Sequence, residues 1–357
     1  MQVEQRRFVT LTRSDEDFAD YLLGKGPDGL RALPVESFAI NSPRERVTFA
    51  LVAPEKIKRP AWLTRYVLAL RLELLPLTLA PLLVSWAAIW VKGGQLAFFK
   101  VIFMLINIVA LHAAAFTRND YEDHLHGIDR IQRRRGSQVI QRGWLSALEV
   151  RNISRAALLV SVIAGLPLLW PPSADVVLLG SLGLAAVLGY GFAGRGFKNQ
   201  GVGDVVVGLC MGPLLTLGVG KIFAAEEALW LACVGLPLGL GAVIVFQLRQ
   251  LETIMTERQS GAGTMMARLG FDRAKRWLQM ELWFLPIFTT VALWAWVPTK
   301  MALLLTALVA LGQLPLQRRL RRIASPLSSD LLGLARHALW FYMALAGALI
   351  LTVGAAG

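Results

Sequence analysis

A short polar stretch near residue 120 combines residue types that bind a metal–phosphate group. Residues 118–129 read Arg-Asn-Asp-Tyr-Glu-Asp-His-Leu-His-Gly-Ile-Asp, with four acids in ten residues. If the preceding apolar helix continues past Phe116, Asn119 and Asp123 lie on one face at i and i+4, with Asp120 beside them. Such crowded acids repel one another unless a cation is present. Their oxygens suit Mg²⁺, which takes one or two carboxylates together with substrate phosphates. The alternative interpretation is a solvated helix end.

Basic residues follow this stretch, and a second polar stretch lies further along the chain. Arg130 and the arginine run 133–135 could neutralise phosphate oxygens as point charges or bidentate forks. Residues 249–264 carry Glu252, Glu257 and Arg258. Both stretches follow a long apolar run, so the arrangement of those runs must position them.

The apolar runs dominate the chain. Its 357 residues are 55% hydrophobic and 17% charged, with mean hydropathy +0.53, whereas soluble domains average about 25% charged. Cys210 and Cys233 both lie in apolar runs, which excludes a thiol metal cluster and a disulfide framework. The runs are near the ~20 residues that a transmembrane helix needs, and they lack the period of two of a strand. We predict an all-α integral membrane protein with nine transmembrane helices, at 66–91, 96–117, 145–169, 175–194, 203–222, 228–248, 277–297, 300–316 and 337–355.

The charges between these spans predict their orientation. Arginines crowd the loops after the second, fourth, sixth and eighth spans, whereas the other loops hold only Lys92, Lys221 and Lys300. The positive-inside rule then places the N-terminus and the basic loops in the cytoplasm and the C-terminus outside, in an inner or cytoplasmic membrane. The same charges account for the net charge of +13 without nucleic acid as a partner.

The first 60 residues differ from the rest. They carry mixed charge and turn residues, with strand-like stretches at 8–12 and 47–52 and a short helix expected between Asp15 and Leu23. We expect an extramembrane segment over 1–60, a membrane domain over 61–357, and a binding surface for a protein partner within the segment.

Four segments together resemble the UbiA superfamily of intramembrane aromatic prenyltransferases. The pattern Asn-Asp-Tyr-x-Asp-x-x-x-Gly-x-Asp at 119–129 is similar to its first aspartate motif, and similar segments follow in order at 139–146, 198–204 and 212–215. The resemblance covers roughly residues 62–355. It is strongest to the branch that prenylates 1,4-dihydroxy-2-naphthoate in menaquinone synthesis.

The resemblance implies nine helices around a central apolar cavity and a Mg²⁺-dependent transfer of a polyprenyl chain from its diphosphate to an aromatic acceptor. It implies that Asp120 and Asp123 bind the diphosphate through Mg²⁺, with Asn119 orienting. A second ion would bind Glu257, together with Glu252. Residues that would meet phosphate are Lys198, Arg258, Arg133 and Arg71.

The second motif departs from the family pattern. Anchoring on Gly261 and Thr264 puts Glu257 at the second acidic position, but Thr253 at the first and Ala262 at the usual lysine. The alternative function is therefore a catalytically impaired homologue that serves as a quinone- or lipid-binding or structural subunit of a membrane complex. A transporter is a third alternative, although no inverted repeat is visible.

Two polar residues inside apolar spans have two interpretations each. Arg71 lies where the family has an arginine, but near a span end it could equally snorkel to the membrane surface. His112 is seven residues before Asn119 and can face the same cavity, or it can be a hydrogen-bonded packing histidine.

Overall fold

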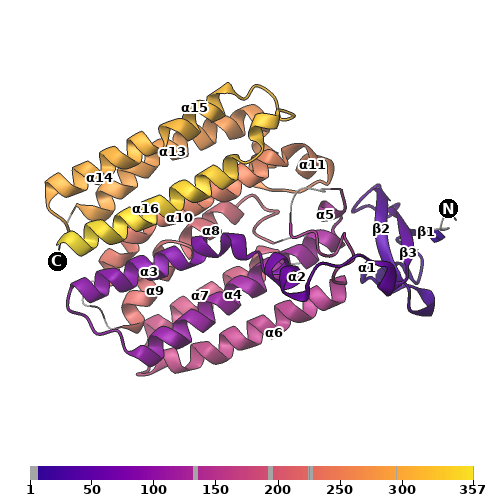
Figure 1. Ribbon diagram of the computed structural model, residues 1–357, viewed down its shortest axis with the longest axis horizontal. Coiled ribbons are helices and arrows are strands. Elements are labelled where there is room, and N and C mark those ends of the chain that lie inside the picture. The colour runs from indigo at the N-terminus through magenta and orange to yellow at the C-terminus, as the bar shows by residue number, and fades with distance from the viewer. Residues whose placement is uncertain are drawn as a thin grey trace.

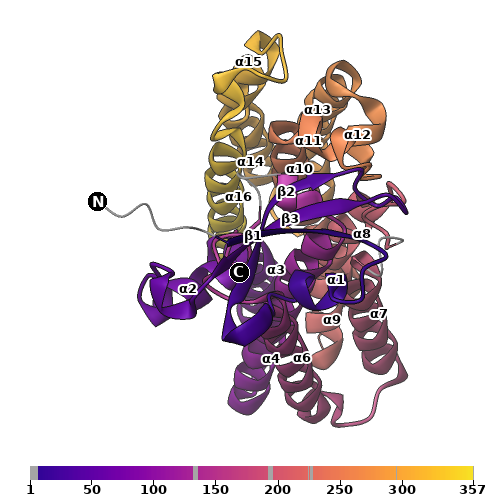
Figure 2. The ribbon, with the colours of Figure 1, turned by 90° about the vertical axis from the view of Figure 1, so that its right-hand side faces the viewer.

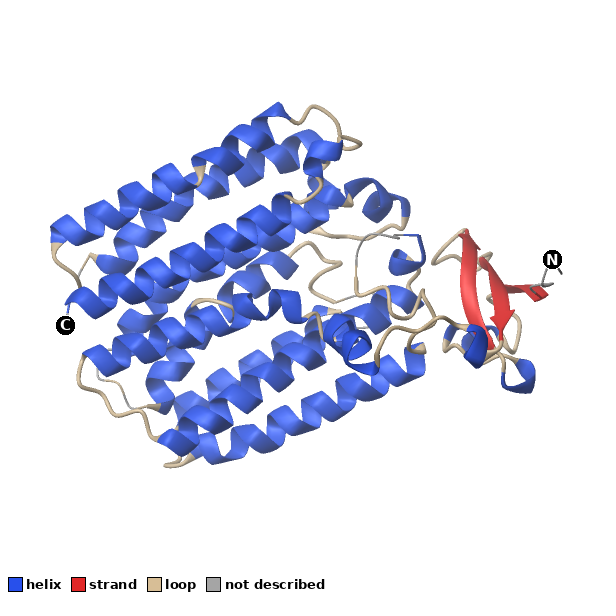
Figure 3. Ribbon diagram, in the orientation of Figure 1, coloured by secondary structure: helices blue, strands red, loops and turns tan. Residues whose placement is uncertain are grey.

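A bundle of long helices carries a small β-sheet at one end (Figures 1 and 3). The computed structural model describes residues 7–131, 136–191, 196–223, 225, 228–294 and 296–356. The last helix ends at the opposite end of the bundle from the sheet (Figure 1). The chain is therefore mostly helical, and its strands lie in the N-terminal part, where strand-like stretches were expected at 8–12 and 47–52.

Each predicted span coincides with one helix or with a helix broken in two. The segments of the bundle are α2 Trp62–Ala69, η3 Leu72–Leu74, α3 Leu75–Val91, α4 Phe98–Leu125, α5 Ile128–Ile131, α6 Ala147–Gly165, η4 Leu166–Leu169, α7 Ala174–Tyr190, α8 Gly203–Cys210, α9 Pro213–Ile222, α10 Ala228–Glu252, α11 Ile254–Gln259, α12 Met265–Leu269, α13 Phe271–Leu293, α14 Thr299–Gly312, α15 Leu314–Arg322, η6 Ser329–Leu331 and α16 Leu334–Ala356.

The number of membrane crossings stays a prediction. In the described part of the chain, seven helical segments are long and apolar enough to cross a bilayer. Helix α7 is apolar but has 17 residues, and α13 begins with a charged stretch that includes Arg273 and Arg276. Large apolar side chains such as Leu159, Leu304 and Leu351 are exposed on the bundle. Surfaces of this kind are stable in lipid, as expected for an integral membrane protein.

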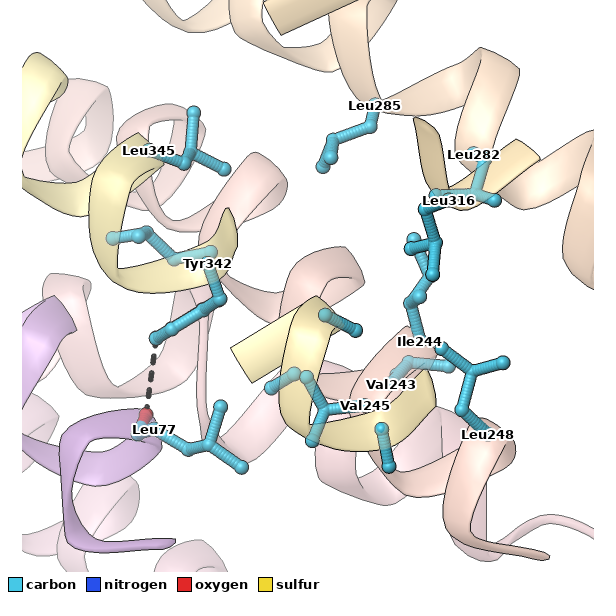
Figure 4. Packing of buried hydrophobic residues seen from close by; sticks show 14 of the residues in the cluster. Leu77, Val243, Ile244, Val245, Leu248, Leu282, Leu285, Leu316, Tyr342 and Leu345 are labelled. Atoms are coloured by element: carbon cyan, nitrogen blue, oxygen red, sulfur yellow. Dashed lines mark hydrogen bonds between the residues drawn. The ribbon is translucent and has the colours of Figure 1, made fainter. Parts of the chain in front are cut away.

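The bundle is closely packed on one side and hollow on the other. Buried side chains of α3, α10, α13 and α16 fill the packed side (Figure 4). There the Tyr342 hydroxyl of α16 donates a 3.1 Å hydrogen bond to the Leu77 carbonyl of α3. A cavity of about 420 Å³ lies instead among α4, α6, α7 and α9. The structure therefore contains an apolar cavity between helices, whereas the region around α10 is filled by side chains.

The N-terminal part is an antiparallel sheet in the order β1-β3-β2. Its segments are β1 Arg7–Thr12, α1 Phe18–Leu22, η1 Pro27–Gly29, β2 Arg31–Phe38, β3 Arg46–Val52 and η2 Pro54–Lys56. Phe18, Leu22, Val47 and Phe49 form its core, against which Leu125 at the end of α4 packs. The sheet therefore lies across the helix ends on the side of α4 (Figure 2).

Candidate active site

The polar end of α4 forms the centre of the site. Helix α4 continues nine residues beyond Phe116, to Leu125, so Asn119, Asp120 and Asp123 are helical. All three side chains are buried, although they are polar. The Asn119 amide nitrogen donates a 2.9 Å hydrogen bond to Asp123 Oδ2, as the i, i+4 spacing allows.

Arg71 reaches Asp120 from a break between two helices. At φ 48° and ψ 48°, Arg71 is a left-handed residue between α2 and η3. Its guanidinium donates to Asp120 Oδ1, and both side chains are buried. The backbone N–H of Ser137 donates to the other Asp120 oxygen over 3.1 Å. Because the left-handed conformation is unfavourable for a residue with a Cβ, the buried ion pair helps to hold this turn.

Lys198 reaches Asp123 from the loop after α7. Its Nζ lies 2.6 Å from Asp123 Oδ1 and 2.5 Å from Oδ2, and 3.3 Å from the Asn119 amide oxygen. Lys198 is 2% exposed. The loop is attached to α7 through a 3.1 Å hydrogen bond from the Lys198 N–H to the Tyr190 carbonyl. Two cations from distant segments thus neutralise the two aspartates.

Asp129 on α5 adds a third carboxylate. It is buried, and its Oδ1 has no hydrogen-bond partner among the described residues. Gly136 lies against it, since a Cβ there would be 2.8 Å from Asp129 Oδ2. Burial raises the pKa of Asp129 well above its ordinary value, the charges of Asp123 and Asp120 raise it further, and Arg71 and Lys198 oppose the shift.

These side chains fit a magnesium ion that is shared with a phosphate. Within the part of the chain that the structure describes, no three carboxylate, histidine or cysteine groups converge as a complete metal shell. Mg²⁺ needs only one or two carboxylates, together with phosphate oxygens and water. Asp129 Oδ1 has no partner among the described residues. The oxygens of Asp120 and Asp123 are bonded to Arg71, Ser137 and Lys198, and they would become metal ligands when the two cations bind phosphate instead.

The second polar stretch packs against the first. Helix α11 contacts α5, and Glu257 on α11 is fully buried. The Thr264 hydroxyl donates a 2.5 Å hydrogen bond to Glu257 Oε2. Arg268 donates a 2.9 Å hydrogen bond to the Asn199 carbonyl, next to Lys198. Glu257 therefore lies beside α5, which carries Asp129, and near the loop that carries Lys198.

Glu252 is directed elsewhere. Its Oε1 accepts a 3.3 Å hydrogen bond from the N–H of Ala335, in the first turn of α16. Together with Thr253 and Arg249, it lines a separate pocket of about 320 Å³. Glu252 thus satisfies a helix N-terminus that would otherwise lack a partner, and this placement does not support the predicted metal ligand.

The remaining predicted residues have different surroundings. Arg258 is exposed on α11, and Ala262 supplies only a backbone N–H, 2.9 Å from the Glu257 carbonyl. Arg133 lies outside the described residues. His112 is buried, with Nδ1 2.8 Å from the Thr78 hydroxyl, and it lines the cavity. His112 is thus both a hydrogen-bonded packing residue and a residue that faces the cavity, as the two interpretations of the sequence had it.

The apolar cavity adjoins the carboxylate cluster at Phe116. Phe116 lines it, and the Arg71 guanidinium lies 5.6 Å from the centroid of the Phe116 ring. Asp120 follows Phe116 by one helical turn. The volume of the cavity, about 420 Å³, falls in the range of about 300–1,000 Å³ typical of small-molecule pockets. The geometry can hold a charged head at the carboxylates and an apolar tail in the cavity.

A buried polar cluster was missed from the sequence. Gln247 of α10 donates 3.1 Å hydrogen bonds to Asp204 of α8 and to Glu281 of α13. Gln250, one turn later, donates over 2.9 Å to Asp204. The available signal was the occurrence of these amides and acids inside apolar runs. The cluster joins three helices beside the second polar stretch.

Comparisons with known proteins agree with this geometry. The chain matches the model of the UbiA prenyltransferase family over residues 78–330. A 1,4-dihydroxy-2-naphthoate octaprenyltransferase from Escherichia coli (strain K12) is 28% identical over 251 residues, which cover 66% of this chain and 79% of that protein. The protein of the same name from Haemophilus influenzae is 25% identical over 212 residues, covering 56% of this chain and 67% of that protein.

Solved structures share the fold. A UbiA homologue from Archaeoglobus fulgidus bound to GPP and Mg²⁺ has a TM-score of 0.57 at 16% identity, covering 80% of this chain and 99% of its own. The apo form of a homologue from Aeropyrum pernix K1 has a TM-score of 0.57 at 17% identity, covering 82% of this chain and 97% of its own. At these identities the likeness establishes the arrangement of the helices alone.

Proposed function

Because the chain belongs to the UbiA prenyltransferase family and is a prenyltransferase, we propose that it transfers a polyprenyl chain from its diphosphate to 1,4-dihydroxy-2-naphthoate or a similar aromatic acceptor. The reaction is Mg²⁺-dependent and serves quinone biosynthesis. The names of the relatives from Escherichia coli and Haemophilus influenzae support this acceptor. The homologue bound to GPP and Mg²⁺ supports the donor and the metal.

One observation carries the proposal. Asn119, Asp120 and Asp123 meet Arg71 and Lys198 just beyond Phe116 on α4, and Phe116 lines the apolar cavity. A polyprenyl diphosphate has the matching shape, with a polyanionic head and a long apolar tail. Asp120, Asp123 and Asp129 would hold Mg²⁺, which neutralises the charge that develops on the leaving diphosphate. Glu257 would assist from the second stretch.

The protein's own groups then act on the two ends of the donor. With metal held by the carboxylates, the guanidinium of Arg71 and the ammonium of Lys198 would bind diphosphate oxygens. Stabilising this charge favours departure of the diphosphate with the electron pair of the allylic C–O bond. The apolar cavity holds the tail and excludes water, so that a ring carbon of the acceptor rather than water captures the allylic cation. As the new carbon–carbon bond forms, that ring carbon releases its own substituent, a proton or a carboxyl group lost as CO₂, and the ring regains its aromaticity.

The setting of the reaction follows from the charges. We assign the carboxylates and the N-terminus to the cytoplasmic side of an inner or cytoplasmic membrane and the C-terminus to the outside, since the arginine-rich loops follow alternate spans. The lipid bilayer then supplies the polyprenyl substrate. Nucleic acid is not expected as a partner.

The catalytically impaired alternative is less favoured. Thr253 and Ala262 support it, because each replaces a polar family residue. The assembled cluster at the first motif supports the enzyme, and so do relatives that are prenyltransferases. The two functions differ in a direct assay.

The test is prenyl transfer by purified protein in detergent, with a set of polyprenyl diphosphates and either 1,4-dihydroxy-2-naphthoate or 4-hydroxybenzoate. We expect product with the naphthoate, loss of product with EDTA, and recovery on adding Mg²⁺. Folded protein that makes no product from either acceptor would contradict the proposal.

A further inference from the structure

The N-terminal sheet lies outside the part of the chain that matches the family, yet it contacts the carboxylate loop closely. The family match begins at residue 78, whereas the sheet occupies 7–52. Strand β2 packs against α5, the short helix that carries Asp129. Figure 2 shows the sheet in front of the helix ends.

A buried ion pair connects the two parts. Glu45, in the turn before β3, accepts a 2.6 Å hydrogen bond from Arg130, the residue after Asp129. The Arg130 and Glu45 side chains are 1% and 2% exposed. Arg130 also donates to the Leu125 carbonyl over 3.2 Å. Arg130 was expected to face phosphate, but it is engaged by the N-terminal sheet instead.

Close contacts on both sides of the ion pair fix how the N-terminal part packs against residues 124–130. The Asn41 amide donates a 2.8 Å hydrogen bond to the His126 carbonyl. His124 Nε2 lies 2.9 Å from the Leu22 carbonyl. Gly127, at φ 76°, leaves room for Ile40, because a Cβ there would be 2.5 Å from the Ile40 side chain. These contacts define one position for residues 124–130.

The sheet also holds the far end of the same loop. Arg31 donates hydrogen bonds of 3.1 Å each to the Gly143 carbonyl and to Glu149. The Trp144 indole donates over 3.2 Å to the Lys58 carbonyl. The described residues between α4 and α6 are thus held by the N-terminal part at both ends, while Ser137 and Gly136 in between contact Asp120 and Asp129.

We propose that residues 7–60 are a positioning unit for the diphosphate site, with Glu45 as a positioning residue that holds Asp129 in place through Arg130. The proposal rests on the proposed function of the carboxylates. Glu45 itself contacts neither substrate nor metal. A buried ion pair specifies geometry more than it adds stability, and here it specifies where Asp129 meets Asp120 and Asp123. Because Asp129 is proposed to hold the Mg²⁺ that neutralises charge developing on the leaving diphosphate, a displaced Asp129 raises the KM for the diphosphate and also lowers kcat.

The test compares Glu45→Gln with Arg13→Met. Arg13 Nη1 lies 3.4 Å from the other Glu45 oxygen and its side chain is 52% exposed. Removing it leaves the buried pair of Glu45 and Arg130 in place, so it is the matched control. For Glu45→Gln we expect the KM for polyprenyl diphosphate in Mg²⁺ to rise about 5-fold or more, as for ordinary coupling between sites. We expect kcat to fall as well, and hydrogen exchange of residues 126–131 to accelerate. Arg13→Met should leave all three unchanged.

Each failure has its own signature. A KM within twofold of wild type for Glu45→Gln, or unchanged hydrogen exchange at 126–131, overturns the positioning unit. Wild-type protein without transfer activity overturns the proposed function instead, and hydrogen exchange alone then decides the positioning. If Glu45→Gln does not fold, Asn41→Gly removes the contact to His126 while keeping the left-handed backbone at φ 58°, and it is judged by the same criteria.

Discussion

Replacing Asp120 by Asn should abolish turnover and also destabilise the metal-free protein. The Arg71 guanidinium bonds to Asp120 where both residues are buried, at 5% and 2% exposure. Removing one charge leaves the other in a site that water does not reach. The two effects have different origins, so a second substitution can separate them.

The expected loss of stability follows from the burial of the pair. Two unit charges about 3 Å apart attract by about 5–6 kcal/mol at an effective dielectric constant near 20, and breaking a buried pair costs about 3–5 kcal/mol. Asp129, Asp123 and Glu73 also act on Arg71 and retain part of the attraction. We therefore expect about 3 kcal/mol, or a melting temperature lower by about 6 °C or more.

The assay is thermal unfolding in detergent with EDTA, for Asp120→Asn, Arg71→Met and the double variant, combined with prenyl transfer in Mg²⁺. The double variant should regain most of the free energy of unfolding that Asp120→Asn loses, because it leaves no unpaired buried charge. Turnover should stay at least about 100-fold below wild type in Asp120→Asn and in the double variant, because both lack the proposed metal ligand. A coupling energy below about 0.5 kcal/mol would refute the buried pair, and near-wild-type turnover of Asp120→Asn would refute the assignment of this loop.

Three further perturbations test other parts of the site. Glu257→Gln should weaken Mg²⁺-dependent transfer by about 10-fold or more, whereas Glu252→Gln, which contacts α16, should leave the Mg²⁺ dependence unchanged; equal effects in Mg²⁺ titrations would contradict this placement. Gly183→Leu should shift product toward shorter prenyl chains, because Gly183 lines the cavity with open space at its Cβ position; an unchanged chain-length profile would show that the tail lies elsewhere. The raised pKa of Asp129 means that the folded, metal-free protein binds a proton that the unfolded chain has lost, so its stability should fall as pH rises from the ordinary aspartate pKa through the raised one. Melting temperatures in EDTA should show this slope, and Asp129→Asn should remove it.

Local rules in the sequence predicted the helices and the first carboxylate cluster. Apolar runs of membrane length specify helices because lipid leaves backbone groups no other partner, and the spans coincide with the observed helices. The i, i+4 spacing of Asn119 and Asp123 needs only a continuous helix, and α4 continues past both. Strand β2 was missed because it contains Pro34, which the sheet accommodates at a register shift between Pro34 and Glu36.

Partners from distant segments depended on the tertiary structure. Lys198 meets Asp123 over a separation of 75 residues, and Glu45 meets Arg130 over 85. Whether a charged residue faces substrate or another side chain is decided by packing, as Arg130 and Glu252 show, since both acquired protein partners instead of the predicted ligands.

The sequence by itself determined that this chain builds apolar helices of membrane length with a carboxylate cluster at the end of one of them, because spacing along a single helix decides both. Only the tertiary structure decided which cations meet the cluster, where the cavity lies and what the first 60 residues contact. Those properties depend on side chains that converge from different helices, and no local pattern records that convergence.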